Sequence, residues 1–152
     1  MAAPLRIRVS LIDPDSHYRL FLASCLNSSS RHRVLQTAES AASALQWPQV
    51  PVPHVMLVEA DLPDLPCGEL IRKLRNRFTN TLFIVLTTTQ DEQQLTEAIQ
   101  AGVVGYVLKS VGKDAILEAI DEALAGGSPL SLPVARHVLR LVRTSNPPFP
   151  AE

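Results

Sequence analysis

Five short apolar segments, each followed by a segment with the hydrophobic spacing of a helix, limit the folds open to this chain. Strands are predicted at residues 7–12, 34–38, 55–58, 81–87 and 103–109, and helices at residues 16–30, 41–45, 70–80, 91–102 and 112–127. Neighbouring parallel strands require helical crossovers, which are right-handed. The alternation therefore predicts an α/β fold with a doubly wound, five-stranded parallel sheet.

Four polar side chains follow strands of this predicted sheet. Asp13 and Glu59 come after the first and third strands, and Thr87 and Lys109 end the fourth and fifth. The carboxyl ends of parallel strands meet at one edge, where open α/β sheets bind ligands. Taken singly, Lys109 is an ordinary solvated lysine and Thr87 an ordinary strand-end hydroxyl. Their occurrence together with two carboxylates favours a functional site at this edge.

The composition excludes several classes of protein. A length of 152 residues with 46% hydrophobic residues allows one domain and an appendage. The net charge of -1 lacks the basic footprint of a nucleic-acid or anionic-membrane surface. No apolar run approaches the length of a membrane span, so a cytoplasmic protein is expected. Cys25 and Cys67 form no close-spaced pair and are expected to be reduced thiols. The four histidines, of which His32 is expected in a turn, form no cluster of metal ligands.

A sixth helix is predicted after the fifth strand–helix unit. Ser131-Leu132-Pro133 has the pattern of a helix start, and an apolar stripe follows at Val134, Val138, Leu141 and Val142. This stripe fits packing either on the chain's own domain or on a partner. The residues after it are rich in proline and have the composition of a linker.

The strand-end motifs occur in a recognisable order. Leu11-Ile12-Asp13 is followed by Arg19, residues 53–59 end in Glu59, Thr87 closes the fourth strand, and residues 102–109 read Gly-Val-Val-Gly-Tyr-Val-Leu-Lys. In this order and spacing, residues 6–127 resemble the receiver domain of two-component response regulators, and within that family the LuxR/NarL-type group. Residues 123–136 resemble the end of such receivers, where they lead into a DNA-binding domain.

The resemblance implies a flavodoxin-like fold with strand order 2-1-3-4-5. It implies a receiver domain over residues 1–127, a C-terminal helix over residues 128–144 and a linker or disordered tail over residues 145–152. The residue at position 59 would accept phosphate from a histidine kinase, with Mg²⁺ held between it and two acids after the first strand. Lys109 and Thr87 would contact the phosphoryl oxygens, and Thr87 with Tyr106 would report phosphate to the outer face of the fourth and fifth helices. Receivers of this type commonly form homodimers.

Two residues depart from the family pattern. Glu59 stands in place of the phosphate-accepting aspartate, and its extra methylene moves the nucleophile by more than about 1 Å, which can cost on the order of a hundredfold in rate. Pro14 stands in place of the second acid, which leaves Asp13, Glu59 and the carbonyl of Asp61 for a metal. Mg²⁺ binding is therefore expected to be weakened or lost. Asp15 is a substitute acid, although a role as helix cap is favoured for it.

These departures lead to one main expectation and several alternatives. The main expectation is a receiver domain that acts without phosphorylation, held toward an active-like state because Glu59 reaches Thr87 and Lys109 as a phosphoaspartate does. The alternatives are a receiver with weak phosphotransfer through Glu59, and a stand-alone protein–protein adaptor. An enzyme is not expected, since residues 13–17 contain no phosphate-binding glycine loop and no nucleophile–base pair is evident. DNA would be reached only through a domain beyond Glu152.

Overall fold

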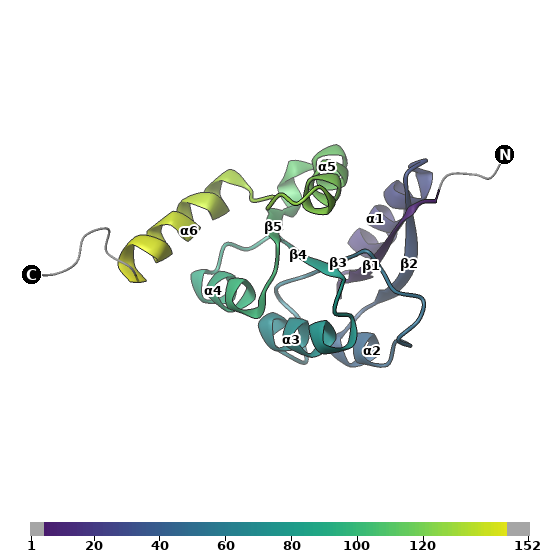
Figure 1. Cartoon of the computed structure of the whole chain (residues 1–152), viewed down its shortest axis with the longest axis horizontal. Coiled ribbons are helices and arrows are strands. Elements are labelled where there is room, and N and C mark those ends of the chain that lie inside the picture. Colours follow the sequence, from purple (N-terminus) through teal and green to yellow (C-terminus); the bar gives the residue numbers. More distant parts are fainter. Residues whose placement is uncertain (1–4, 146–152) are drawn as a thin grey trace, which may run out of the picture.

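The computed structural model describes residues 5–145 and contains one parallel sheet of five strands (Figure 1). Its order is β2-β1-β3-β4-β5, which confirms the predicted doubly wound sheet and its strand order. The strands are β1 (Ile7–Ile12), β2 (His32–Ala38), β3 (Val55–Val58), β4 (Leu82–Thr87) and β5 (Gly105–Leu108).

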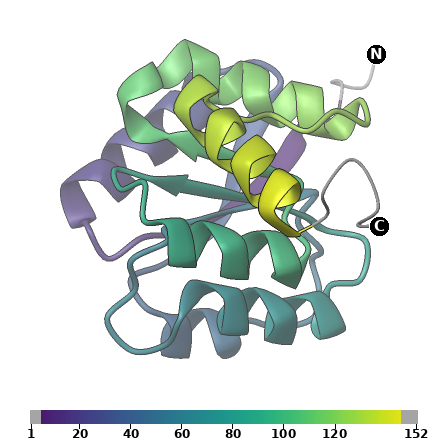
Figure 2. The ribbon, with the colours of Figure 1, turned by 90° about the vertical axis from the view of Figure 1, so that its left-hand side faces the viewer.

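Helices cover both faces of this sheet (Figures 1 and 2). α1 (Ser16–Ser28) and α5 (Lys113–Leu124) lie on one face. α2 (Ala41–Leu45), α3 (Cys67–Arg77) and α4 (Glu92–Ala101) lie on the other. The apolar side chains of the sheet accordingly divide between two buried clusters, one under each layer of helices. Within residues 5–145, every helix is too short or too polar to cross a membrane.

The central strand β3 positions the candidate site. All four of its residues are buried, as the run of apolar residues predicted. Val9 to Ile12 of β1 pair with Val55 to Val58, so β1 and β3 end side by side. Residues that follow these two strands are therefore neighbours in space.

Several element boundaries differ from the sequence prediction, including those of β2, α3 and β5. β2 begins at His32 rather than in a turn, because His32 pairs with Ile7 and its buried ring contacts Asp121 of α5 at 3.1 Å. α3 ends at Arg77 rather than near Asn80, although the buried Phe78 continues the apolar spacing beyond the helix. β5 covers only Gly105–Leu108, and Lys109 begins a 3₁₀ turn, η1 (Lys109–Val111).

The segment after α5 runs along the free edge of β5. The backbone of Tyr106 donates to Pro129 O at 3.0 Å and accepts from Ser131 N at 3.2 Å. Ser131 Oγ accepts a hydrogen bond from Leu108 N at 2.9 Å. Gly105 allows the close approach, because a Cβ there would lie 2.8 Å from Pro129. Residues 129–131 thus act as a short extra strand on β5.

α6 (Leu132–Ser145) follows directly and lies across the molecule between α4 and α5 (Figure 2). Val134 is 1% exposed and joins the buried cluster on the α4 side, with Val138 packed against it. Part of the predicted apolar stripe therefore packs on the chain's own domain. Of the predicted linker, residues 146–152 lie outside the described residues.

We expect the Ser131 hydroxyl to hold α6 in this position. Ser131→Ala leaves the Leu108 N–H without its partner, and an unpaired donor of this kind costs about 1–3 kcal/mol. Hydrogen–deuterium exchange should then become faster in β5 and α6. Ser128→Ala, an exposed serine of the same segment, is the matched control and should leave exchange unchanged. Equal exchange in both variants would contradict a role for Ser131.

Candidate functional site

Two carboxylates emerge from neighbouring strands at the carboxyl edge of the sheet. Asp13 follows β1 and Glu59 follows β3, and they are 6% and 7% exposed. Their backbones continue the sheet pairing, since Asp13 N donates to Ala38 O and Glu59 N donates to Ile12 O. The two acids are therefore held by the sheet itself.

Lys109 lies between these carboxylates. Its Nζ is 2.6 Å from Asp13 Oδ2 and 3.0 Å from Glu59 Oε1. All three side chains are 9% exposed, so the contacts are much less screened by water than those of a surface pair. The expected pair between Glu59 and Lys109 is present, and Asp13 joins it to form an ion cluster of three residues.

Tyr18 closes the ion cluster from α1. Its ring centroid is 4.2 Å from Lys109 Nζ, which is a cation–π contact. Burial, together with the nearby Asp13, Cys25 and Glu59, raises the pKa of Tyr18 to about 12. Tyr18 was not among the predicted site residues, and the only signal of this role was an aromatic residue in the first turn of the helix that follows Asp13.

The charge of Lys109 follows from a balance of opposing effects. Burial lowers the pKa of a lysine, because it disfavours the ammonium form. Hydrogen bonds and charge attraction from Asp13 and Glu59 outweigh burial, so the pKa of Lys109 is raised above its ordinary value of 10.5. Lys109 is therefore an ammonium at neutral pH.

The other two acids of the loops have separate places. Asp15 is the N-cap of α1, with its Oδ1 accepting from Tyr18 N at 3.1 Å, and its own N–H donates to Asp13 Oδ1 at 2.9 Å. The cap role that the sequence favoured is thus the observed one. Asp61 contributes its backbone N–H to Glu59 Oε2 at 3.1 Å, whereas its side chain is exposed.

Thr87 and Tyr106 lie inside the fold. Both are 0% exposed. Thr87 Oγ1 contacts the hydroxyl and backbone N–H of Thr89, at 3.4 and 3.3 Å, rather than Glu59 or Lys109. The Tyr106 hydroxyl has no hydrogen-bond partner among the described residues, and burial raises its pKa. Neither member of the expected switch pair is therefore hydrogen-bonded to the ion cluster.

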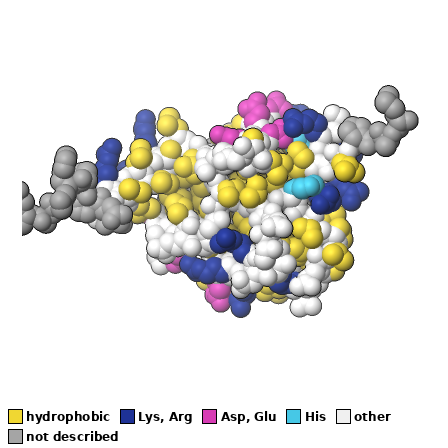
Figure 3. Space-filling model, viewed as in Figure 1, with side chains coloured by type: hydrophobic (Ala, Val, Ile, Leu, Met, Phe, Trp, Pro, Cys, Tyr) yellow, Lys and Arg dark blue, Asp and Glu magenta, His cyan; other side chains and the backbone are white. Residues whose placement is uncertain are grey.

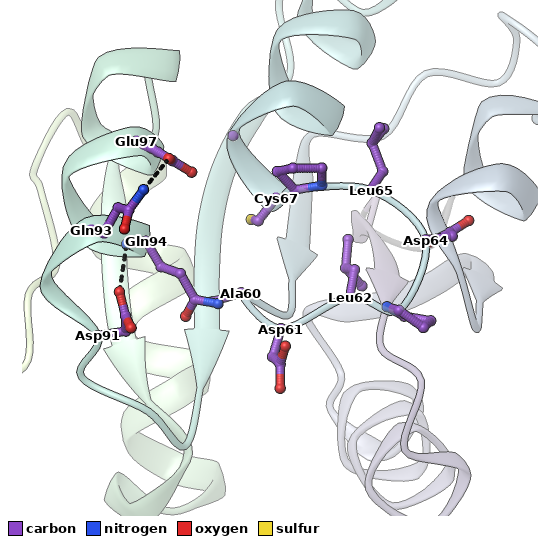
Figure 4. Close-up of a pocket in the computed structure, with 13 residues that line it drawn as sticks. Ala60, Asp61, Leu62, Asp64, Leu65, Cys67, Asp91, Gln93, Gln94 and Glu97 are labelled. Carbon is purple, nitrogen blue, oxygen red and sulfur yellow. Dashed lines mark hydrogen bonds between the residues drawn. The ribbon is translucent and has the colours of Figure 1, made fainter.

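A separate groove lies beside the site, between the loop after β3 and the start of α4 (Figure 4). It has a volume of about 590 Å³ and is lined by four acids, Asp61 and Asp64 from the loop after β3, Asp91 at the N-cap of α4 and Glu97 within α4. Asp64 accepts hydrogen bonds from the backbone at the start of α2, and Asp91 does so at the start of α4.

Across residues 5–145, no group of three or more His, Cys, Asp and Glu side chains is placed to hold a metal. The weakening or loss of Mg²⁺ binding stays a prediction.

Lys109→Met should reveal what the ammonium contributes. The variant leaves Asp13 and Glu59 facing each other without a cation, and removing one partner of a buried ion pair typically costs about 3–5 kcal/mol. We expect a loss of unfolding free energy near the lower end of this range. Glu59→Gln keeps the length of the side chain and leaves Lys109 paired with Asp13, so its loss should be smaller. Urea unfolding measures both, and equal losses would contradict the central position of Lys109.

The pH dependence of the same comparison follows from the raised pKa of Lys109. A lysine with a higher pKa in the folded state stabilises fully below its unfolded value of 10.5, and this contribution disappears as the pH rises through the folded value. The difference between wild type and Lys109→Met should therefore persist from neutral pH into the ordinary lysine range and shrink above it. If the difference in unfolding free energy between wild type and Lys109→Met already falls just above neutral pH, the raised pKa of Lys109 is contradicted.

Comparison with solved structures places this site in a known fold. A LuxR-family two-component response regulator from Aurantimonas sp. superposes with a TM-score of 0.81 at 23% identity, over 90% of this chain and 98% of that one. ChrA, the response regulator of a heme-sensing two-component system, gives a TM-score of 0.73 at 26% identity, over 97% of this chain and 70% of that one. Both share the arrangement of sheet and helices.

Comparison with sequences gives the family. The transcriptional regulatory protein MctR of Rhizobium johnstonii is 28% identical over 97% of this chain and 70% of its own length. The transcriptional regulatory protein DegU of Brevibacillus brevis is 25% identical over 91% of this chain and 58% of its own length, so this chain spans little more than half of DegU. The profile of the response regulator receiver domain matches residues 9–121. The chain therefore belongs to the family of response regulator receiver domains.

Proposed function

We propose that this receiver domain signals without being phosphorylated. The observation that carries the proposal is that the chain supplies a partner to all four oxygens of the two site carboxylates. Lys109 Nζ contacts one oxygen of Asp13 and one of Glu59. Backbone N–H groups of Asp15 and Asp61 donate to the other two. Attack on a phosphoryl donor would have to use the remaining lone pair of a Glu59 oxygen whose charge is already drawn toward an ammonium or a backbone N–H, which makes that oxygen a weaker nucleophile.

The position of the ammonium supports the proposal in a second way. Receivers hold a divalent metal beside the carboxylates at this edge, and Mg²⁺ requires an octahedral set of oxygens. Pro14 contributes no side-chain oxygen, and Lys109 Nζ lies between Asp13 and Glu59. In our proposal Lys109 therefore takes the place of the metal cation, and the residues present do not suit Mg²⁺.

A route from the ion cluster to the surface runs through β5. Lys109 follows Leu108, whose N–H binds Ser131 at the start of α6. Tyr106, two residues before Leu108, is paired to both Pro129 and Ser131. In the proposal, the permanent contact of Lys109 with Glu59 keeps β5 and α6 in one arrangement. This arrangement is the active-like state.

The output of the domain would be regulation of transcription. The support is that relatives such as MctR and DegU are named as transcriptional regulatory proteins and are longer than this chain. We propose that DNA is contacted by a domain beyond Glu152, that two copies of the chain associate, and that no histidine kinase is required. A stand-alone adaptor is the second candidate, and the gene sequence beyond residue 152 separates the two.

Exposure to a small acyl-phosphate donor and Mg²⁺ tests the central part of this proposal. We expect mass spectrometry of the intact protein to show no added phosphoryl group on the wild type. The double variant Pro14→Asp/Glu59→Asp, which restores both acids of the family pattern, should gain a labile phosphoryl group under the same conditions. Phosphorylation of wild-type Glu59 to the same extent would contradict the proposal and support the alternative of residual phosphotransfer.

A further inference from the structure

α6 carries an apolar stripe that its own domain does not cover. Its inner stripe is anchored by Val134, which is 1% exposed. On another side of the helix, Leu132, Leu139 and Val142 are 67%, 56% and 54% exposed. Spacings of seven and three place these three residues on one side of a helix. We call this side the outer face of α6.

Arginines border the outer face. Arg136, Arg140 and Arg143 follow at spacings of four and three, and all three are exposed. α6 contains no Asp or Glu. Figure 3 shows basic side chains over α6 and acidic side chains gathered over α5, with hydrophobic side chains between them. The outer face therefore fits an apolar surface that has an acidic rim.

A groove with these properties lies along α5 of the same chain. It has a volume of about 190 Å³ and runs between α5 and residues 129–131. Its apolar lining includes Val107, Val111 and Leu130, and Val111 and Leu130 are 40% and 37% exposed. Glu118 and Glu122, both exposed and four residues apart, supply the charge, and the lining contains no Lys or Arg. We call this the α5 groove.

The chain's own α6 does not fill the α5 groove. Val134 belongs to the buried cluster that includes Leu95 and Ala98 of α4, on the other side of the sheet. α6 starts near α5 and crosses toward α4, and in Figure 1 it extends away from the body of the domain. The groove and the outer face are thus two complementary surfaces that one copy of the chain leaves open.

We propose that the outer face of α6 docks in the α5 groove of a second copy, and that the two copies exchange these contacts reciprocally. The arginines and glutamates have opposite charge, and the two helices have similar lengths of about 21 and 18 Å for 14 and 12 residues. A two-fold exchange fills both grooves at once and closes the assembly at two copies. This inference rests on the homodimer of the proposed function and names its surface.

Charge reversal on each surface tests the docking. One variant carries Arg136→Glu and Arg140→Glu, and the other carries Glu118→Lys and Glu122→Lys. In the dimer of either variant, like charges then face each other at both contacts between α6 and the α5 groove. We expect the apparent Kd for dimerisation of the whole chain to rise at least about tenfold for each variant, as measured by analytical ultracentrifugation. An equimolar mixture should recover dimers of wild-type affinity, because opposite charges then meet at both contacts.

The control is a matched reversal elsewhere, Arg72→Glu/Lys73→Glu on the exposed side of α3, which should leave the dimer unchanged. Dimers that resist both reversals, or a mixture that stays monomeric, would overturn the docking and leave the homodimer of the proposed function in place. A wild type that is monomeric at all concentrations would overturn both. Phosphorylation independence is judged separately, by the phosphoryl-donor experiment.

Discussion

The contact of Lys109 with Asp13 and Glu59 is the interaction on which the site depends. Each residue leaves the end of a different strand, so the three strands meet at one cation. Two carboxylates that contact the same ammonium lie close enough to repel each other, and the attraction of each one to Lys109 offsets this repulsion. Tyr18 brings α1 into the same cluster through its ring. The ion cluster thus adds a charge contact to the backbone pairing that already joins the ends of β1 and β3, and it links both of them to the end of β5.

The architecture could be predicted from the sequence, because its signals are local. Strand–helix alternation and right-handed crossovers predicted the sheet, and the strand ends predicted that Asp13, Glu59 and Lys109 would meet. Tyr18 was missed, because helical spacing alone does not reveal which aromatic side chain of a helix lies over a charge. Residues 129–131 were missed as an edge strand, because the pairing depends on the bare backbone of Gly105. His32 was misplaced, because its partner Asp121 lies far along the chain.

As a receiver domain, this chain combines a site whose carboxylates are held by Lys109 with a C-terminal segment that is paired to β5. All four oxygens of Asp13 and Glu59 have partners in the chain itself. The same strand that ends at Lys109 holds residues 129–131 by backbone hydrogen bonds and thereby sets where α6 begins. In this account the glutamate supplies the charge that a phosphorylated aspartate would bring, and β5 transmits its consequence to α6.

In the proposed function, Lys109 takes the place of a metal ion. A titration with Mg²⁺, followed by NMR at the backbone amides of Asp13, Glu59 and Asp61, tests this most directly. We expect no saturable shift in the wild type at millimolar Mg²⁺, and a saturable shift in Lys109→Met, where the two carboxylates are free of the ammonium. Saturable binding of Mg²⁺ by the wild type at these three residues would contradict it.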